Sequence, residues 1–368
     1  MKERITNGML IALIINMIYP KSIGVSQGVM AREIGSDIWL STLFSCVQAL
    51  IIMIIVVSIV KNLPKEPVFS GKAKLFVNGL KRLIYILLFI FFIGAFGDIM
   101  LIFVYHLRDY FLPEAQTWIF VLLGTLIGIY AIFHGIEVSG RLALLGVIFV
   151  VLFNILLLLG SLKQFDIREL QPVFNSGVGN TYWASRHMLT DWASAIMVAI
   201  ILVPTVNKIE SVRKSSIIGV LFATGIMIIW PILEVGVLSS EITAQYIVSC
   251  MQMARSAEIG LFIHRYEMIM VAFFAFSIFT QIITTLYCAS YSAKQIFNLQ
   301  DYRKMIIPSA IILSGYSLWL LQDHHHAMHI TENQRVTIGL WLLVIIPILI
   351  FILGFIYKKK NKNGATSN

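Results

Sequence analysis

Two charged side chains, Lys21 and Asp98, lie deep within apolar stretches of this sequence. Counted from the charged ends of their stretches at about 1.5 Å per helical residue, Lys21 lies roughly 20 Å in and Asp98 roughly 24 Å in. Similar depths allow an ion pair that neutralises both charges, or a ligand carboxylate that replaces the aspartate beside the lysine. The alternative is that Lys21 snorkels toward water while Asp98 hydrogen-bonds within its own bundle.

Lys21 belongs to an interruption of the first apolar stretch. An apolar run ends at Tyr19 and is followed by Pro20, Lys21, Ser22, Ile23 and Gly24. Proline lacks an N–H group and clashes with the preceding turn, and glycine weakens a helix. Within a bilayer such backbone persists only where protein, water or a ligand satisfies it, so a break in the first span indicates a substrate site near the midplane. A proline-kinked helix is the alternative.

A polar stripe follows one face of the stretch from 266 to 296. Ser277, Gln281, Thr284 and Cys288 are spaced by four, three and four residues, so they share one side of a helix. The stripe should face the interior of a bundle, where its hydroxyl and amide groups suit a substrate or a cation. Hydrogen bonds to neighbouring helices are the alternative use of such groups.

A second interruption is expected in the stretch from 187 to 207. Asp191 precedes a run of small residues that includes Ser194 and Ala195, and Pro204 follows near the far end. Small residues permit close approach of two backbones, which suits either a broken helix or ordinary helix packing. We predict the broken helix.

The sequence gives little indication of metal or enzyme chemistry. His325 and His329 have the i, i+4 spacing of a chelating pair on a helix, within a run that also includes His324 and His326, but a solvated loop is the favoured interpretation. Glycine-rich phosphate loops, nucleophile elbows and zinc-protease motifs are missing. The three cysteines show no paired spacing. We therefore expect a protein that is not an enzyme, with no cofactor and no metal.

The elements that must position these residues are transmembrane helices. Hydrophobic residues make up 58% of the 368 positions and charged residues only 13%, which predicts an all-α integral membrane protein. Stretches of about 18 or more apolar residues are long enough to span a bilayer. The ten predicted spans lie at about 8–34, 38–60, 82–106, 115–134, 141–162, 187–207, 215–238, 266–296, 305–322 and 335–357.

The charges of the connecting segments predict the orientation. Most of the 28 lysines and arginines fall in the two tails and in the loops after spans two, four, six and eight, which places both termini in the cytoplasm. The net charge of +9 then indicates anionic lipid rather than nucleic acid. The apolar N-terminal stretch lacks a cleavage pattern and should be a retained span. We expect one polytopic domain over 1–357 and a basic cytoplasmic tail over 358–368.

Several strings together resemble the B subunits of bacterial spore germinant receptors. The Asp37-Ile38-Trp39 string at the start of span two is similar to an acid-x-W motif of that family. Similar strings are Leu-Gln-Pro-Val at 170–173, Ile-His-Arg-Tyr-Glu at 263–267, and the segments 286–290 and 297–303 around the end of span eight. The strings occur in the family's order over nearly the whole chain.

This resemblance implies the amino acid, polyamine and organocation transporter superfamily. Its members have a leucine-transporter-type fold of two inverted five-helix repeats, here about 8–162 and 187–357, with broken first and sixth helices. The family acts in the spore inner membrane beside an A subunit and a lipoprotein C subunit, where it senses amino acids, sugars or nucleosides. The implied ligand pocket involves Tyr19, Pro20, Lys21, Ser22, Gly24, Asp98, Ser194, Ala195, Met197, Ser277, Gln281 and Thr284.

The chain departs from the family pattern at two points. Pro20-Lys21 stands where members commonly have Gly-Thr, and Ser194-Ala195 stands where many have Gly-Glu. Loss of that carboxylate argues against the usual proton coupling and amine recognition, and Lys21 is expected to bind an anionic group instead. The leading interpretation is a permease-like subunit of a nutrient germinant receptor. The alternatives are an active secondary transporter of a small solute and a scaffold whose pocket has decayed.

Overall fold

The computed structural model describes residues 4–63, 71–108, 111–257 and 266–365. In this part of the chain the regular structure is helical, apart from one backbone bridge between Ile5 and Val206. The α-helices are α1 (Asn7–Ser22), α2 (Ser26–Ile34), α3 (Ile38–Val60), α4 (Gly71–Arg108), α5 (Thr117–Phe133), α6 (Ile136–Ser161), α7 (Val178–Ala184), α8 (Arg186–Leu202), α9 (Val212–Met227), α10 (Ile229–Leu238), α11 (Ser240–Gln245), α12 (Ser249–Ser256), α13 (Tyr266–Ile296), α14 (Ile306–Leu320), α15 (His324–His329) and α16 (Arg335–Ala365). Short 3₁₀ turns are η1 (Gly35–Asp37), η2 (Ile167–Leu170), η3 (Val203–Thr205), η4 (Ile209–Ser211) and η5 (Tyr302–Met305), and η6 (Ile330–Gln334) is a π-helical turn.

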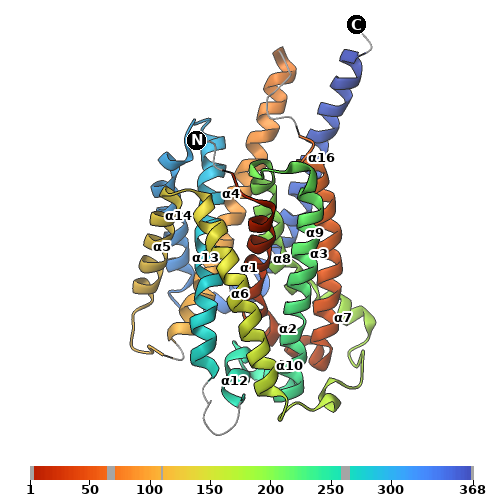
Figure 1. Ribbon diagram of the computed structural model, residues 1–368, viewed down its shortest axis with the longest axis vertical. Helices are drawn as coiled ribbons and strands as arrows, with labels where there is room; N and C mark the ends of the chain where they lie inside the picture. The colour runs from red at the N-terminus through yellow and green to blue at the C-terminus, as the bar shows by residue number, and fades with distance from the viewer. Residues whose placement is uncertain (1–3, 64–70, 109–110, 258–265, 366–368) are drawn as a thin grey trace.

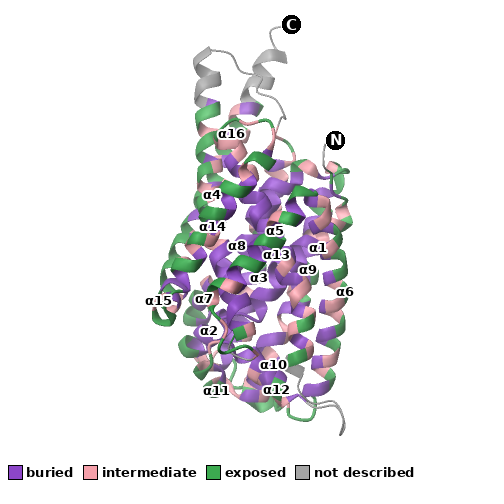
Figure 2. Ribbon diagram, turned by 90° about the vertical axis from the view of Figure 1, so that its left-hand side faces the viewer, coloured by how far each residue is buried: buried purple, intermediate pink, exposed green. Residues whose placement is uncertain are grey.

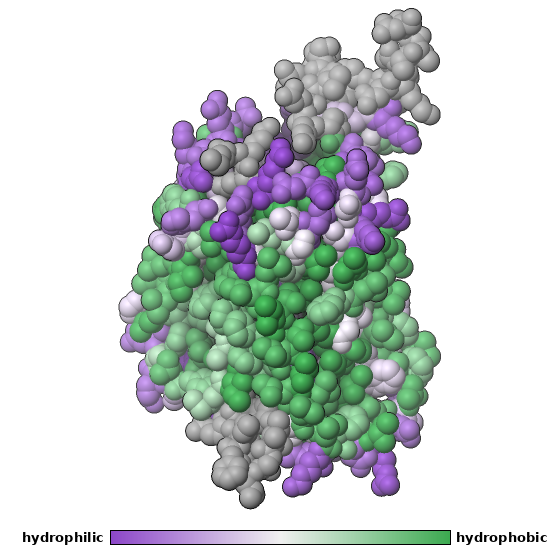
Figure 3. Space-filling model, in the orientation of Figure 1, coloured by the Kyte–Doolittle hydropathy of each residue, from purple (hydrophilic) through white to green (hydrophobic). Residues whose placement is uncertain are grey.

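The helices form a bundle with an apolar outer belt. Figure 3 shows hydrophobic residues around the middle of the visible face and hydrophilic residues gathered toward its ends. Within the described residues, seven stretches are long and apolar enough to cross a membrane as continuous helical segments. Each of the ten predicted spans coincides with one helix or with a pair of helices. Among the spans formed by a single helix, the shortest are α14 with 15 residues and α5 and α8 with 17 each.

The first span is interrupted, as its sequence predicts. The helix α1 ends at Ser22, residues 23–25 are not helical, and α2 begins at Ser26. Pro20 and Lys21 lie in the last turn of α1 rather than in the unwound segment. The gap begins three residues after the proline because the ring disturbs the preceding turn while the chain that follows can stay helical.

The predicted break in the sixth span is wrong. The helix α8 runs without interruption from Arg186 to Leu202, so the structure contains no break at Ser194 and Ala195. Neither residue forces an interruption, since alanine favours a helix and a buried serine tolerates one. The chain instead turns at Ser185, between α7 and α8, and changes to the 3₁₀ turn η3 where Pro204 occurs.

The helix α1 lies in the interior of the bundle, in contact with α6, α8, α9 and α13. Residues 12–22 of α1 are all buried, as is nearly the whole of α8, and Figure 2 shows these interior residues surrounded by exposed outer faces. The start of α1 and the end of α16 lie at the same end of the bundle (Figure 1), and α10, α11 and α12 lie at the opposite end (Figure 2). The common end of the two termini agrees with the predicted topology, although the side of the membrane and the two repeats stay predictions.

Parts of two sequence predictions concern residues that are not described. The Ile-His-Arg-Tyr-Glu string at 263–267 lies mainly in the gap from 258 to 265, and the basic tail at 358–368 ends beyond residue 365. The charged residues Lys2 and Glu3 of the N-terminal tail and Lys65 and Glu66 of the loop after span two also lie outside the described residues.

Candidate functional site

The carbonyl group that Pro20 leaves without a helical partner is satisfied by α13. In a regular helix the N–H group of residue 20 would donate to the carbonyl of Asn16, but proline has no N–H to give. The side-chain amide of Gln281 donates to that carbonyl at 3.1 Å and to the carbonyl of Met17 at 2.7 Å. A neighbouring helix therefore replaces the missing backbone bond, which is how proline is tolerated within membranes.

Other backbone carbonyls at the break are also satisfied by side chains. The Ser22 hydroxyl donates to the carbonyl of Tyr19 at 2.6 Å, and Gln27 donates to the carbonyl of Ser22 at 3.0 Å. The thiol of Cys250, on α12, donates to the carbonyl of Ile23 at 3.2 Å. Burial raises the pKa of this thiol well above its ordinary value, so the S–H form persists. The unwound segment is thus completed by protein groups and does not require a ligand on its backbone.

Beside the break, four charged side chains from four helices form one cluster. Lys21 forms an ion pair with Asp98 of α4, as their similar depths predict. Arg335, at the start of α16, lies 3.3 Å from the same Asp98 oxygen and 2.5 Å from Asp191 of α8. Ser26 joins both by accepting from Arg335 at 3.2 Å and donating to Asp191 at 2.6 Å. The cluster ties α2, α4, α8 and α16 to the end of α1.

The electrostatic balance of this cluster explains how it exists inside a membrane protein. Two carboxylates face one ammonium and one guanidinium, so the four formal charges sum to zero. The side chains of Lys21 and Asp191 are 1% exposed, whereas those of Asp98 and Arg335 are 8% and 16% exposed. Removal of any one partner would leave an uncompensated buried charge, which is far more costly than the loss of a surface pair.

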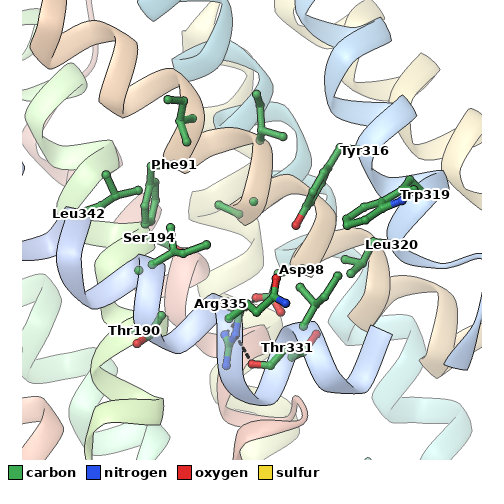
Figure 4. Close-up of a pocket in the computed structure, with 18 residues that line it drawn as sticks. Phe91, Asp98, Thr190, Ser194, Tyr316, Trp319, Leu320, Thr331, Arg335 and Leu342 are labelled. Atoms are coloured by element: carbon green, nitrogen blue, oxygen red, sulfur yellow. Dashed lines mark hydrogen bonds and ion pairs between the residues drawn. The ribbon is translucent and has the colours of Figure 1, made fainter. Parts of the chain in front are cut away.

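Asp98 and Arg335 keep this slight exposure because they face a cavity of about 300 Å³. Figure 4 shows both side chains at the polar end of the cavity, where Arg335 also donates to the carbonyl of Thr331 at 3.2 Å. Most of the wall is apolar or aromatic and comes from α4, α8, α14, η6 and α16. The lining residues are Ile90, Phe91, Ile93, Gly94, Ala95, Asp98, Thr190, Ser194, Tyr316, Trp319, Leu320, Ile330, Thr331, Gln334, Arg335, Ile338, Gly339 and Leu342.

Tyr316 and Trp319 of α14 form the aromatic wall opposite α16 (Figure 4). The Tyr316 ring lies against Gly97 of α4, where an added Cβ would come within 2.6 Å of a ring carbon. Glycine at 97 therefore makes room for the ring beside Asp98. At the rim, Trp319 and Ile338 are 46% and 53% exposed on the outside of the bundle. The cavity consequently combines an apolar mouth with a charged floor, which suits a small molecule that has both characters.

Two of the twelve predicted ligand-binding residues, Asp98 and Ser194, line this cavity. Lys21 pairs with Asp98 but is not itself part of the cavity lining. The remaining predicted residues are Tyr19, Pro20, Ser22, Gly24, Ala195, Met197, Ser277, Gln281 and Thr284, and they lie outside the cavity lining. Their role in ligand binding stays a prediction.

The polar stripe of α13 contacts neighbouring helices, as the alternative interpretation held. Ser277 donates to the Asn16 side chain at 2.7 Å, and Thr284 exchanges a hydrogen bond with Ser139 of α6 at 2.6 Å. Asn16 in turn donates to the carbonyl of Ala143 at 2.9 Å. Together with Gln281, the stripe fixes α1 against α6 and α13.

The histidine run begins a short helix, α15, beside Tyr105 of α4. His325 and His329 lie on α15 and are exposed, and His324 makes a 3.1 Å contact from Nδ1 to the Tyr105 hydroxyl. Among the residues that the structure describes, no group of three or more His, Cys, Asp or Glu side chains is arranged to hold a metal ion.

Arg335 was not identified from the sequence. It stands at the predicted start of span ten, where a basic residue normally belongs to a loop. In the structure, α15 and η6 extend the helical path before it, so Arg335 lies within the bundle instead of at its surface. The sequence did contain one indication, the polar run Thr-Glu-Asn-Gln-Arg at 331–335. These residues continue the helical path before α16 instead of forming a loop.

One of the strings that suggested a family holds the loop that follows another. The carboxylate of Asp37 accepts from the backbone N–H groups of Phe174 and Ser176 at 2.8 and 2.9 Å, and from the Ser176 hydroxyl at 2.8 Å. This aspartate therefore holds the loop that follows Leu-Gln-Pro-Val at 170–173. The contact therefore joins the start of span two to the loop after span five.

The same fold occurs in solved transporters of low sequence identity. Mhp1, a nucleobase-cation-symport-1 family transporter with bromovinylhydantoin bound, is 14% identical with a TM-score of 0.61, and the match covers 94% of this chain and 78% of that one. MhsT in complex with L-phenylalanine is 14% identical with a TM-score of 0.58, and the match covers 96% and 99% of the two chains. These likenesses show a leucine-transporter-type fold and a multi-pass membrane protein.

Sequence comparison gives a relative along the whole chain. Spore germination protein YndE of Bacillus subtilis (strain 168) is 26% identical over 366 residues, which cover 98% of this chain and 99% of that protein. The model of the family described as spore germination protein matches residues 4–325. Because this match includes most of the chain, the protein belongs to the spore germination protein family of permeases.

Proposed function

We propose that this protein is the permease-like subunit of a nutrient germinant receptor in the spore inner membrane, and that a small nutrient binds in the cavity above Asp98 and Arg335. The observation that carries the proposal is the ion cluster. It joins the broken first span to α4, α8 and α16, and it meets the cavity through only two of its charged members.

A charged or strongly polar ligand can act on this cluster by competition. A ligand carboxylate would attract Arg335 away from Asp98, and a ligand ammonium would attract Asp98 away from Arg335 and Lys21. Either exchange changes the forces between α2, α8 and α16 because each carries a member of the cluster. Ligand binding therefore shifts the equilibrium between two arrangements of the helices, and the partner subunits detect the shift.

The proposed partners are the A subunit and the lipoprotein C subunit of the receptor, with both termini of this chain on the cytoplasmic side. The class of nutrient remains amino acids, sugars or nucleosides. The apolar mouth and charged floor favour a ligand with an apolar part and one ionic or polar end. The cavity of about 300 Å³ is at the small end of ligand pockets, which agrees with a nutrient monomer.

An active secondary transporter is the second candidate. The fold is shared with proteins described as symporters, and a ligand that shifts helices is also the basis of alternating access. The two functions differ in whether net movement of solute follows binding.

Binding of a nutrient panel to the purified full chain tests the proposal. We expect saturable binding of one class, and loss of at least about tenfold in affinity for Arg335→Gln, since one charge-assisted contact is typically worth 1.5–3 kcal/mol. Arg32→Gln is the matched control because Arg32 pairs with Glu332 outside the cavity lining. Equal affinity of both variants and the wild type would refute the assigned site. Net uptake of the bound solute into vesicles would favour the transporter.

A further inference from the structure

Glu234 of α10 is a buried carboxyl group that belongs neither to the ion cluster nor to the cavity. It is 0% exposed and lies within a stretch apolar enough to span the membrane. One of its carboxyl oxygens accepts from the Ser249 hydroxyl at 2.8 Å. The other oxygen is buried and has no hydrogen-bond partner.

The other buried acids of the described residues differ from Glu234 in their partners. Asp98 and Asp191 pair with Lys21 and Arg335, and Asp37 accepts three short hydrogen bonds from one loop. Glu234 has no ion pair with any described basic residue. An isolated carboxylate buried in an apolar medium is costly, so the side chain is far better accommodated as a neutral acid.

The groups around Glu234 do not supply a counter-charge. Cys250 on α12 interacts electrostatically with Glu234 but is a neutral thiol, and Thr243 on α11 donates to the Glu234 backbone carbonyl at 3.3 Å. The remaining titratable groups on elements that contact α10 are Arg255 on α12, Glu241 on α11, Asp166, Arg168 and Glu169 at η2, Tyr19 and Lys21 on α1, Cys46 on α3, Arg213 and Lys214 on α9, and Glu137 and Arg141 on α6. Of this set, Tyr19 and Cys46 are buried neutral groups and Lys21 is paired with Asp98. The other acids and bases are exposed or partly exposed, and those of α6 and α9 lie at the far ends of their helices.

The helix α12 covers the carboxyl group and also contacts the break in the first span. Ser249 and Cys250 are its first two residues, and Ser249 donates to Glu234. Cys250 donates to the carbonyl of Ile23 at 3.2 Å and lies 3.8 Å from Nε2 of His106. Figure 1 places α12 beside α10, at the end of the bundle opposite the end of α16. Movement of α12 away from α10 would therefore expose Glu234 to water and release the Ile23 carbonyl together.

We propose that Glu234 is a proton-binding site covered by α12, and that release of its proton is linked to displacement of α12 from the broken first span. With α12 in place the carboxyl group holds its proton and needs no counter-charge. When the proton passes to water, the carboxylate that remains requires hydration, which α12 prevents in its observed position. The site uses none of the cavity residues, so it is independent of the nutrient proposal.

The test is the rate at which a maleimide labels Cys250 in the reconstituted full chain with Cys46→Ala and Cys288→Ala. The rate is measured from mildly acidic to mildly alkaline pH for this protein and for the same protein with Glu234→Gln. The reactivity of the thiol itself rises with pH in both, so the ratio of the two rates isolates the contribution of Glu234. We expect the ratio to rise by up to about tenfold per pH unit, because the population with α12 displaced follows the deprotonated fraction.

Glu234→Asp is the matched variant because it keeps a carboxyl group, and its rate should retain the pH dependence that Glu234→Gln loses. In infrared spectra, the band of a protonated buried carboxyl group should disappear in Glu234→Gln and shift in Glu234→Asp. A ratio that is constant over pH would overturn the proposal. A ratio that responds to sodium at constant pH would overturn it as well, since the site would then bind a metal cation.

Discussion

The two halves of the broken first span are held by different forces. Before the break, α1 is fixed by neutral hydrogen bonds: Gln281 and Ser277 of α13 contact its backbone and Asn16, and Asn16 contacts α6. After the break, α2 is fixed by charges: Ser26 joins Asp191 and Arg335, and Glu33 accepts from Arg186 at 2.7 Å and from His187 at 2.9 Å.

Because of this difference, α1 has a structural role, whereas α2 can respond to a charged ligand. Neutral hydrogen bonds within the bundle change little with salt or with a charged ligand. Ion pairs are altered by any competing charge, and three of the helices that hold α2 or the cluster also line the cavity. We therefore expect α1 to stay in place during ligand binding while α2 and its partners move.

Breaking the central pair should give the largest effect on stability. Lys21→Met leaves the cluster with two carboxylates and one guanidinium, and we expect a loss of about 3–5 kcal/mol in the free energy of unfolding. Chemical denaturation of the purified protein measures this loss. The exposed Lys304→Met is the matched control and should change little.

The double variant Lys21→Met with Asp98→Asn distinguishes charge balance from lost packing. It restores neutrality because one positive and one negative charge are both removed, so it should recover most of the lost stability. A double variant that is no more stable than Lys21→Met alone would mean that the lysine stem, and not its charge, stabilises the break.

Replacement of Gln281 should have an intermediate effect on the neutral half. Gln281→Leu leaves the Asn16 carbonyl without a partner, and an unsatisfied buried group costs about 1–3 kcal/mol. In a Pro20→Ala background the N–H group of residue 20 can donate to this carbonyl, so the same substitution should cost less. We expect the two sites to be coupled by about 0.5–3 kcal/mol in a double-mutant cycle of unfolding free energies. Simple additivity would show that Gln281 does not replace the missing bond.

The sequence predicts the fold better than it predicts the site. Apolar stretches and basic loops locate the spans, and the proline marks the first break to within a few residues, because these are local properties. The depth of Lys21 and Asp98 also predicts their pairing. Arg335 was missed because its depth depends on η6, and a π-helical turn has no sequence rule comparable to that of proline.

Local sequence also fails to determine the partners of the polar stripe of α13 and the continuity of the sixth span. The spacing of Ser277, Gln281 and Thr284 shows that they face the interior, but spacing does not show whether a helix or a ligand meets them. Small residues at 194 and 195 are equally compatible with a continuous helix and a broken one, and the structure contains the continuous one. Whether a polar side chain meets a helix or a ligand, and whether a helix is continuous or broken, depends on neighbours that are distant in sequence.

The smallest effect is expected from the outer charged contact of α2, where Arg32 and Glu332 lie 2.5 Å apart. Their side chains are 39% and 29% exposed, so water and salt screen the pair and Arg32→Gln should cost at most about 1 kcal/mol. The cost should decrease as salt rises, whereas the cost of Lys21→Met should persist because that pair is buried. Unfolding free energies of both variants at low and high salt measure the contrast. Equal salt dependence of the two would mean that the central cluster is hydrated, and the distinction between its charges and those at the surface would then be lost.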